Sequence, residues 1–347
     1  MPAGNCEDSW YDMRMRYAYQ QLTERERTMF HAAYQAAMEY RSITFIIRTE
    51  PLNENETARV FRALCQDCPE LFQFYTYSMM YTINGDEITY TVSSKDPYCT
   101  KTEYEQRSER IRQAIEEINQ SISAGADDYE VELACYRYLI EHCAYLQDEP
   151  YTISAYSSIV YGHAQCAGYA KGLALLLRCA GIPSLVVSSD DHDWNIVRIN
   201  GIWYQCDATW DDPLGNTFEF LAGQDPYLPH FNIPDRLMLR LESHTYSPSP
   251  FIVPVCTDIR DSYTARSGIY IPAGTAEAGE KLKAAIRNAY AAGKRKLLIR
   301  VDGALEYSVL EDCARNIYSI VPELAGTSLR CYTTKKPELF CVYIEFK

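Results

Sequence analysis

The chain has 347 residues, of which 47% are hydrophobic and 23% are charged. This composition is typical of a globular protein and excludes a largely disordered one, and the length predicts two or three folded units. The formal net charge of −14 argues against nucleic acid and anionic membranes as partners, because both would repel the chain.

The first 125 residues predict a helical region that carries a β-hairpin. Residues 7–40 have helical character, and Thr23 with Glu26 forms a capping box that starts a new helix. A β-branched strand at 43–48, an amphipathic helix within 51–72 and a hairpin around Asn84-Gly85 are expected to follow. A helix over about 102–123 ends this region.

Residues 126–262 predict the central domain. Its first helix spans about 128–143, with Asp127 or Asp128 as the N-cap. Apolar residues then recur at helical spacing over 166–180, and Gly181-Ile182-Pro183 ends that helix, since proline cannot continue it. A buried strand, "SLVVSS", and two strands around Asn200-Gly201 come next.

The rest of the chain predicts a loop-like segment and a small domain. Residues 213–267 are rich in proline, aspartate and aromatic residues and are expected to wrap around a larger unit. Residues 263–347 predict a C-terminal α/β domain with the order strand, helix, strand, helix and two strands. No motif in this domain decides whether it selects substrates, dimerises or stabilises the protein.

The cysteines and the N-terminus bear on location and metal binding. "MPAGNCEDSWYDMRMRY" has no basic stretch followed by an apolar core, so we expect a cytoplasmic protein with reduced thiols, or a secreted one if a leader has been removed. The 13 cysteines cannot all pair internally, because their number is odd. Cys65 and Cys68 form a C-x-x-C motif without a second ligand pair, so no metal site is predicted.

Cys166 is the candidate nucleophile, because it stands where a helix is predicted to start. The unpaired backbone N–H groups of a helix start favour a thiolate and can also hold a developing oxyanion. A thiolate nucleophile further needs a base, and the base needs a residue that orients it.

The predicted hairpin supplies both of these residues. A two-residue turn at Asn200-Gly201 places Trp194 opposite Asp207. His192 and Asp207 then lie diagonally on one face of the hairpin, with Cα atoms roughly 7–8 Å apart. The other face carries Val197, Ile199, Ile202 and Tyr204 and is expected to be the core side.

Three motifs together resemble the transglutaminase-like superfamily, in particular its bacterial cysteine protease/transglutaminase-like members. They are "GHAQCAGYAKGLALLLRCAGIPSLVV", "HDWNIV" and "WYQCDATWDDP", and the resemblance covers about residues 126–215. It implies a papain-like α+β fold, in which the helix that carries the cysteine packs on an antiparallel sheet. It also implies that Cys166 is the nucleophile, His192 the general base and acid, and Asp207 the residue that orients the histidine.

Other residues are candidates for the substrate or oxyanion site. Tyr156 stands where family members often have a tyrosine, and it is either an oxyanion donor or a packing residue. Gln165 directly precedes the nucleophile, and Trp194 and Trp210 are expected to be walls of the cleft. His163 is expected to be a surface or packing histidine.

These residues predict a cysteine-nucleophile acyl-transfer enzyme that acts on peptide or glutamine amides through a thioester. Resolution by water would make it a peptidase or amidase, and resolution by a lysine amine would make it a protein-glutamine transglutaminase. Hydrolysis is the less demanding outcome. The alternative is a non-catalytic transglutaminase-like module that binds a peptide or glycan, which the 29 tyrosines and the extra domain would fit. No cofactor is predicted, and the expected partner is a protein or peptide substrate.

Overall fold

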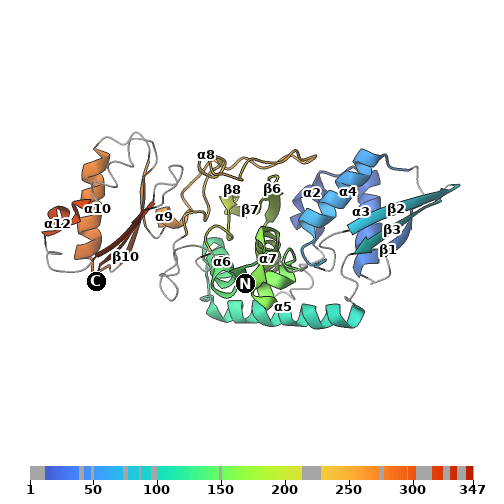
Figure 1. The fold of residues 1–347 in the computed structure, drawn as a ribbon, viewed down its shortest axis with the longest axis horizontal. Coiled ribbons are helices and arrows are strands. Elements are labelled where there is room, and N and C mark those ends of the chain that lie inside the picture. Colours follow the sequence, from blue (N-terminus) through green and yellow to red (C-terminus); the bar gives the residue numbers. More distant parts are fainter. Residues whose placement is uncertain are drawn as a thin grey trace.

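The structure is a computed structural model whose described elements form an elongated arrangement, with the C-terminal elements at one end and the N-terminal sheet at the other (Figure 1). It describes residues 12–38, 43–47, 51–72, 77–85, 87–94, 100–147, 151–212, 228–266, 268–272, 277–294, 296–301, 315–322, 329–333 and 341–346. Residues 7–11 and 39–40 of the predicted helical segment 7–40, and residues 213–227 of the predicted segment 213–267, lie outside these residues.

The N-terminal elements combine helices with a three-stranded antiparallel sheet of order β1-β3-β2. They are η1 (Met13–Met15), α2 (Tyr17–Gln20), α3 (Glu24–Met38), β1 (Ile43–Ile47), α4 (Glu54–Asp67), β2 (Tyr77–Asn84) and β3 (Glu87–Ser94). The predicted capping box before α3 is confirmed, because Thr23 N–H donates to Glu26 Oε2 at 2.7 Å and Glu26 N–H donates to Thr23 Oγ1 at 3.3 Å. The hairpin turn comes one residue later than predicted, since Asn84 still pairs with Glu87.

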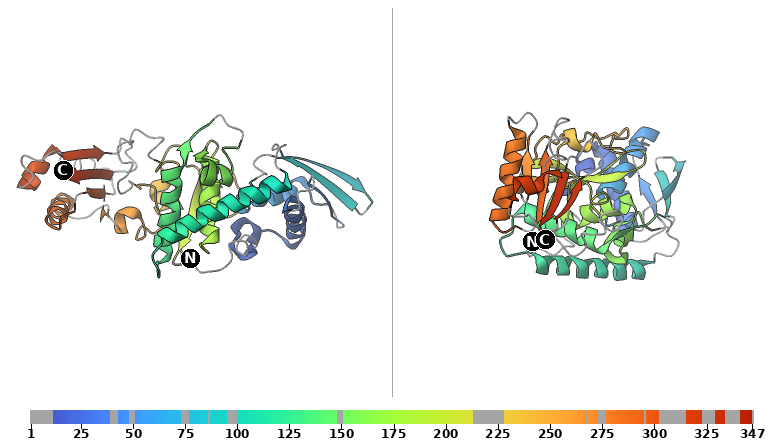
Figure 2. Two further views of the ribbon diagram at one scale, coloured as in Figure 1. Left: turned by 90° about the horizontal axis from the view of Figure 1, so that it is seen from below. Right: turned by 60° about the vertical axis from the view of Figure 1, so that its left-hand side comes forward.

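Two capped helices connect these elements with the centre of the molecule. The long helix α5 (Lys101–Ser121) runs alongside both the N-terminal and the central elements (Figure 2). Helix α6 (Asp128–His142) starts at Asp127, whose carboxylate accepts the Glu130 N–H at 2.9 Å. This bond decides between the two predicted N-caps.

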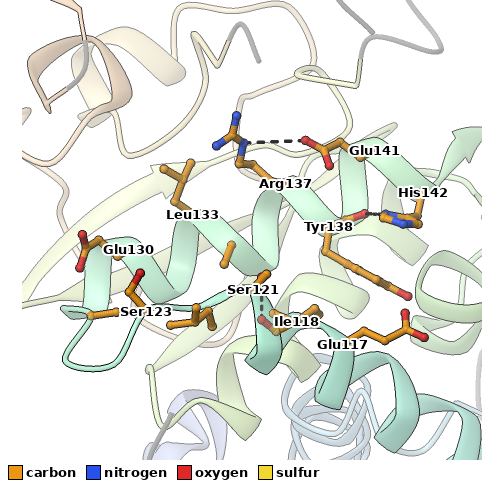
Figure 3. A pocket seen from close by; sticks show the side chains of 13 residues that line it. Glu117, Ile118, Ser121, Ser123, Glu130, Leu133, Arg137, Tyr138, Glu141 and His142 are labelled. Carbon is orange, nitrogen blue, oxygen red and sulfur yellow. Dashed lines mark hydrogen bonds and ion pairs between the residues drawn. The ribbon is translucent and has the colours of Figure 1, made fainter. Parts of the chain in front are cut away.

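A groove of about 480 Å³ lies between α5 and α6 (Figure 3). Apolar side chains such as Ile118 and Leu133 line it together with Glu117, Glu141 and Arg137. None of the residues predicted to be catalytic lines it.

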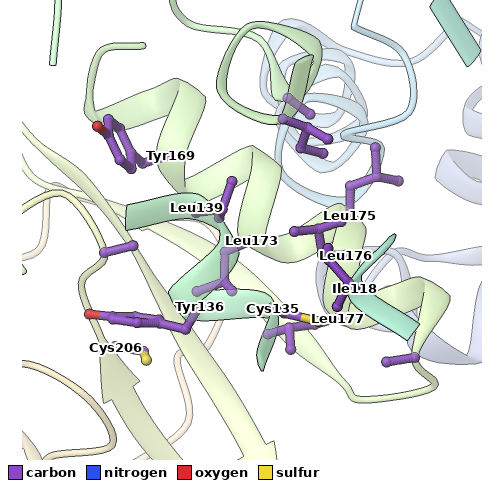
Figure 4. Packing of buried hydrophobic residues seen from close by; sticks show 14 of the residues in the cluster. Ile118, Cys135, Tyr136, Leu139, Tyr169, Leu173, Leu175, Leu176, Leu177 and Cys206 are labelled. Carbon is purple, nitrogen blue, oxygen red and sulfur yellow. The ribbon is translucent and has the colours of Figure 1, made fainter. Parts of the chain in front are cut away.

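The central elements place one helix on a three-stranded antiparallel sheet of order β6-β7-β8. They are β4 (Ala144–Tyr145), η2 (Ser157–Tyr161), β5 (His163–Ala164), α7 (Cys166–Cys179), β6 (Ser184–Ser188), β7 (Asp193–Ile199) and β8 (Ile202–Cys206). Helix α7 ends as predicted, with Gly181 in the left-handed region at φ 78°. Its leucines pack with α6 and with Val197, Ile199 and Tyr204 of the sheet, in a core that Figure 4 shows in part.

The second face of this sheet is also buried, which the sequence did not predict. Trp194 and Ile196 pack there against Ile233, Leu237 and Met238. These last three belong to the segment 228–266, which contains only the short helices α8 (Asp235–Met238) and α9 (Tyr263–Arg266). This segment covers the sheet, as expected for a wrapping segment, so apolar residues are required on both faces.

A buried cluster of charges ties the N-terminal helices to α7. Glu70 accepts from Arg16 Nη2 at 2.6 Å and from Arg178 Nη1 at 3.0 Å, and all three side chains are buried. Tyr34 donates to the same carboxylate at 2.9 Å. Because Arg178 belongs to α7, this cluster joins the two groups of elements directly.

The C-terminal elements form a four-stranded sheet of order β11-β12-β10-β9. They are β9 (Ile269–Ile271), α10 (Ala278–Ala291), β10 (Lys296–Val301), α12 (Ile317–Ile320), β11 (Leu329–Thr333) and β12 (Cys341–Phe346). The predicted order of helices and strands is confirmed for this part of the chain.

The chain thus has the predicted α+β character, whereas the papain-like assignment and the boundaries near residues 125 and 262 remain predictions. Among the described helices, none combines the length and the apolar character that a membrane span requires. Cys166 is a free thiol. Cys179 is disulfide-bonded, so the expectation of reduced thiols is wrong for this residue.

Candidate active site

Cys166 is the first residue of α7 and its side chain is partly exposed. The residue before it, Gln165, is extended and gives the helix no side-chain cap. Gly168 and Tyr169 donate their N–H groups to the Gln165 carbonyl. Within the described part of the chain, the N–H groups of Cys166 and Ala167 have no protein acceptor, so two donors stay available beside the sulfur.

Gln165 anchors the approach to this helix. Its amide donates to the Gln147 carbonyl at 2.6 Å and to Thr152 Oγ1 at 2.8 Å, and its backbone N–H donates to the Thr152 carbonyl at 2.8 Å. Both amide hydrogens are therefore used. Gly168 belongs to the same close packing, because a Cβ added there would overlap the Thr152 carbonyl oxygen.

The register of the central hairpin brings His192 and Asp207 together. The pairing runs as predicted from Ile199 with Ile202 to Asn195 with Cys206. His192 and Asp207 lie just beyond the ends of this ladder, and His192 Nε2 is 2.7 Å from Asp207 Oδ2. Both side chains are buried.

The imidazole of His192 also interacts with the nucleophile. Burial lowers the pKa of His192, but the charge of Asp207 and the hydrogen bonds with Asp207 and Cys166 outweigh burial and raise it from 6.5 to about 10. One imidazole therefore faces the thiol and the carboxylate. At neutral pH it carries a positive charge.

Asp207 is held by four donors. Its Oδ1 accepts the backbone N–H groups of Thr209 at 2.9 Å and Trp210 at 3.1 Å, and its Oδ2 faces His192 and His244. Burial would raise the pKa of Asp207, but the charges and hydrogen bonds of the two histidines hold it well below its usual range. The carboxylate is thus ionised and fixed in orientation.

His244 is the member of this group that the sequence did not reveal. Its Nε2 lies 2.8 Å from Asp207 Oδ2, and its Nδ1 lies 2.8 Å from the Glu242 carbonyl oxygen. It comes from the irregular segment 228–266, 37 residues from Asp207 in sequence. No periodicity or turn pattern in that segment marks it.

The hydrogen-bond distances do not favour a metal ion among these residues. One ligand atom each from His192, Asp207 and His244 lie within 4.8 Å of one another. Two ligands of a tetrahedral zinc ion, each about 2.0–2.1 Å from it, would be about 3.3 Å apart. The observed separations of 2.7 and 2.8 Å are those of hydrogen bonds instead.

Residues 116–208 match the sequence profile of the transglutaminase-like superfamily. The matched segment contains Cys166, His192 and Asp207. This segment is a transglutaminase-like core. The match covers less than a third of the chain and does not extend over the N-terminal or C-terminal elements.

Solved structures share low sequence identity with the chain. A candidate cysteine protease from Cytophaga hutchinsonii is 15% identical with a TM-score of 0.25, over 40% of this chain and 64% of its own. A structure described as a TGase is 14% identical with a TM-score of 0.28, over 75% and 72%. A candidate protease from Parabacteroides distasonis is 9% identical with a TM-score of 0.25, over 78% and 62%. The chain spans less than two thirds of the Cytophaga and Parabacteroides proteins, and no curated protein sequence matches it.

Two tryptophans flank the histidines. Trp194 is only 1% exposed, donates to Gln205 Oε1 at 2.7 Å and stacks on His192 with ring centroids 6.0 Å apart. The buried Trp194 ring packs against the imidazole of His192 and has no exposed surface that could form a wall of the cleft, contrary to the prediction for this residue. Trp210 is partly exposed and lies 4.6 Å from the His244 ring, so it remains a candidate wall.

The Tyr156 side chain is buried. Its hydroxyl accepts from Arg110 at 3.2 Å, and its ring packs 5.6 Å from that of Phe72. None of the contacts described for Tyr156 connects it with Cys166, so the oxyanion role stays a prediction. His163 is exposed, as expected.

Asp211 and Asp212 anchor the end of β8 to both helices of the core. Asp211 accepts from Tyr136 of α6 at 2.7 Å, and Asp212 accepts from Tyr169 of α7 at 2.6 Å. The Tyr136 hydroxyl oxygen also lies 2.6 Å from the Asp207 carbonyl oxygen, so its single proton is shared between these two acceptors. These bonds hold the backbone of Asp207 relative to the helices.

Proposed function

We propose that this protein is a cysteine-nucleophile acyl-transfer enzyme that acts on peptide or glutamine amides. The observation that carries the proposal is the shared imidazole of His192, which interacts with the Cys166 thiol and lies 2.7 Å from Asp207. Asp207 uses Nε2, so Nδ1 is the ring nitrogen left for the sulfur. This arrangement is the one that nucleophilic catalysis by cysteine requires.

Since His192 is an imidazolium at neutral pH, the proposed reaction starts from an ion pair in which the thiol proton of Cys166 already lies on His192. The thiolate attacks the amide carbonyl, and the N–H groups of Cys166 and Ala167 stabilise the oxyanion. The imidazolium then protonates the leaving amine, the C–N bond breaks and a thioester forms. An incoming water or amine loses its proton to His192, attacks the thioester and releases the thiolate.

We propose hydrolysis as the main outcome, because water is abundant and an amine would need a binding site of its own. This makes the protein a peptidase or amidase of the transglutaminase-like type. A protein-glutamine transglutaminase follows if a lysine amine reaches the thioester before water does. A module that only binds peptides or glycans would not need a polarised Cys166.

Alkylation of Cys166 by iodoacetamide at pH 6 tests the proposal, with peptide mapping by mass spectrometry. An ordinary cysteine is only ~0.3% thiolate at this pH, so a thiolate held by His192 should react at least about tenfold faster, even with its lower intrinsic nucleophilicity. We expect His192→Ala to abolish this excess and His163→Ala, at an exposed histidine three residues from Cys166, to preserve it. A wild-type rate equal to that of an unfolded peptide, unchanged in His192→Ala, refutes the enzyme.

A further inference from the structure

His244 has a hydrogen-bond acceptor at each of its ring nitrogens. Nδ1 lies 2.8 Å from the Glu242 carbonyl oxygen, and Nε2 lies 2.8 Å from Asp207 Oδ2. A carbonyl oxygen can only accept, and an ionised carboxylate can only accept. Both nitrogens must therefore donate, which requires an imidazolium.

The surroundings of Asp207 require that its carboxylate is ionised. Each of its oxygens already faces two donors, namely two backbone N–H groups at Oδ1 and two histidines at Oδ2. A proton on Oδ1 would face only donors, and a proton on Oδ2 would face imidazole nitrogens, which are stronger bases and would take it. The charges and hydrogen bonds of the two histidines accordingly hold the pKa of Asp207 well below its usual range. The proton therefore belongs to His244 and not to Asp207.

Charge balance fits the same assignment when Cys166 is a thiolate. The side chains of His244 and Asp207 are 0% exposed and that of His192 is 6% exposed, whereas Cys166 is partly exposed. With Cys166 as thiolate and His192 as imidazolium, the four residues carry two negative charges and one positive charge, and a charged His244 supplies the second positive one. A neutral His244 would leave these four residues with a net negative charge.

We propose that His244 is a positively charged positioning residue that fixes Asp207 and offsets its charge, so that His192 can release its proton during the reaction. This inference rests on the proposed function. Asp207 alone would bind the His192 proton tightly, whereas the leaving amine must receive it. A second cation at the same carboxylate oxygen weakens that attraction.

The segment around His244 is clamped to the loop before His192. Ser243 donates to Asp191 at 2.8 Å, and Ser247 donates to Asp190 at 2.6 Å. The His244 ring also lies between Trp194 and Trp210, with ring centroids 4.9 and 4.6 Å away. These contacts make the position of His244 depend on the same loop that positions His192.

Other titratable groups face His244 from the elements packed around it. Asp207 contacts it directly, and the ring centroid of His192 lies 5.0 Å from that of His244. Asp191 reaches it through Ser243, and Tyr246 stacks on Trp194, whose ring lies 4.9 Å from that of His244. The His230–Asp211 pair lies beyond Trp210. Of these groups, Asp207 is bonded to His244 directly, and His192 faces the same Asp207 oxygen. We therefore expect the loss of the His244 charge to affect the protonation of these two residues most.

The test follows the ring resonances of both histidines by NMR between pH 5 and 12. In the wild-type protein we expect both nitrogens of His244 to carry protons at neutral pH. His244→Gln keeps one N–H donor for Asp207 but removes the charge. His192 and His244 have ring nitrogens within 4.8 Å of each other, so losing a unit charge should raise the titration midpoint of His192 by at least about one pH unit. His142→Gln, at an exposed histidine on α6, should leave the midpoint unchanged.

The outcomes separate this inference from the proposed function. If one His244 nitrogen lacks a proton at neutral pH, or if His244→Gln leaves the His192 midpoint unchanged, the charged role of His244 is overturned while the triad stands. If His192→Ala leaves Cys166 alkylation unchanged, the proposed function fails instead. Should His244→Gln not fold, the wild-type resonances of His244 still decide.

Discussion

Replacing Asp207 by asparagine tests how the site controls the protonation of His192. The asparagine oxygen can still accept from the backbone N–H groups of Thr209 and Trp210, as Asp207 Oδ1 does now. The amide NH2 would then face the two histidines as a donor. His192 could no longer donate from Nε2, so its neutral form would carry the proton on Nδ1, toward Cys166, which is the wrong tautomer for a base.

The magnitude follows from the raised pKa of His192. In the wild-type protein this pKa is raised from 6.5 to about 10, which corresponds to about 5 kcal/mol of preference for the imidazolium. Most of that preference comes from Asp207, and burial opposes it. In Asp207→Asn we therefore expect a neutral His192 at pH 7.5 and a fall in kcat/KM of about a thousandfold.

The assay is the pH dependence of kcat/KM with a peptide substrate, together with NMR titration of His192. The matched control is Asp193→Asn, which neutralises an aspartate next to His192 that makes no hydrogen bond to its ring among the described contacts. The reasoning is refuted if Asp207→Asn keeps activity within tenfold of wild type and His192 still titrates near pH 10.

Two further predictions concern stability. The folded pKa of His192 lies above its unfolded value, so its contribution to stability is complete below about pH 6.5 and disappears as pH rises toward 10. The free energy of unfolding, measured with urea, should therefore fall over this range more steeply for the wild-type protein than for His192→Gln. Equal dependence of this free energy on pH in the two proteins would contradict the prediction. Glu70→Gln leaves Arg16 and Arg178 buried without their anion and should lower the free energy of unfolding by about 3–5 kcal/mol. The control Glu56→Gln breaks a partly exposed pair with Arg25 at 3.8 Å, and it should cost less than about 1 kcal/mol. Equal effects of the two changes would contradict a structural role for the buried cluster.

Local sequence patterns predicted much of this fold. The capping residues Thr23 and Asp127 start helices where expected, because a cap is satisfied within three residues. The Asn200-Gly201 turn predicted the register of the hairpin, since a two-residue turn fixes every later pair. The pairing of His192 with Asp207 then followed from the alternation of side chains and from the family resemblance.

The rest depended on contacts that no local pattern encodes. His244 reaches Asp207 from an irregular segment, so neither periodicity nor spacing pointed to it. Trp194 was expected at the cleft because it shares a face with His192, but the segment 228–266 buries that face. The roles of Asp211 and Asp212 likewise depend on tyrosines from two distant helices.

Mass spectrometry of Cys166 after rapid acid quenching tests the central claim most directly. The protein is mixed with a peptide library and a biotinylated amine, and Cys166→Ala and His192→Ala serve as matched controls. The account predicts an acyl group in thioester linkage on Cys166 of the wild-type protein, absent from both variants, and cleaved peptides or released ammonia as products. Unmodified Cys166 with intact peptides throughout, or products formed equally by Cys166→Ala, would contradict it.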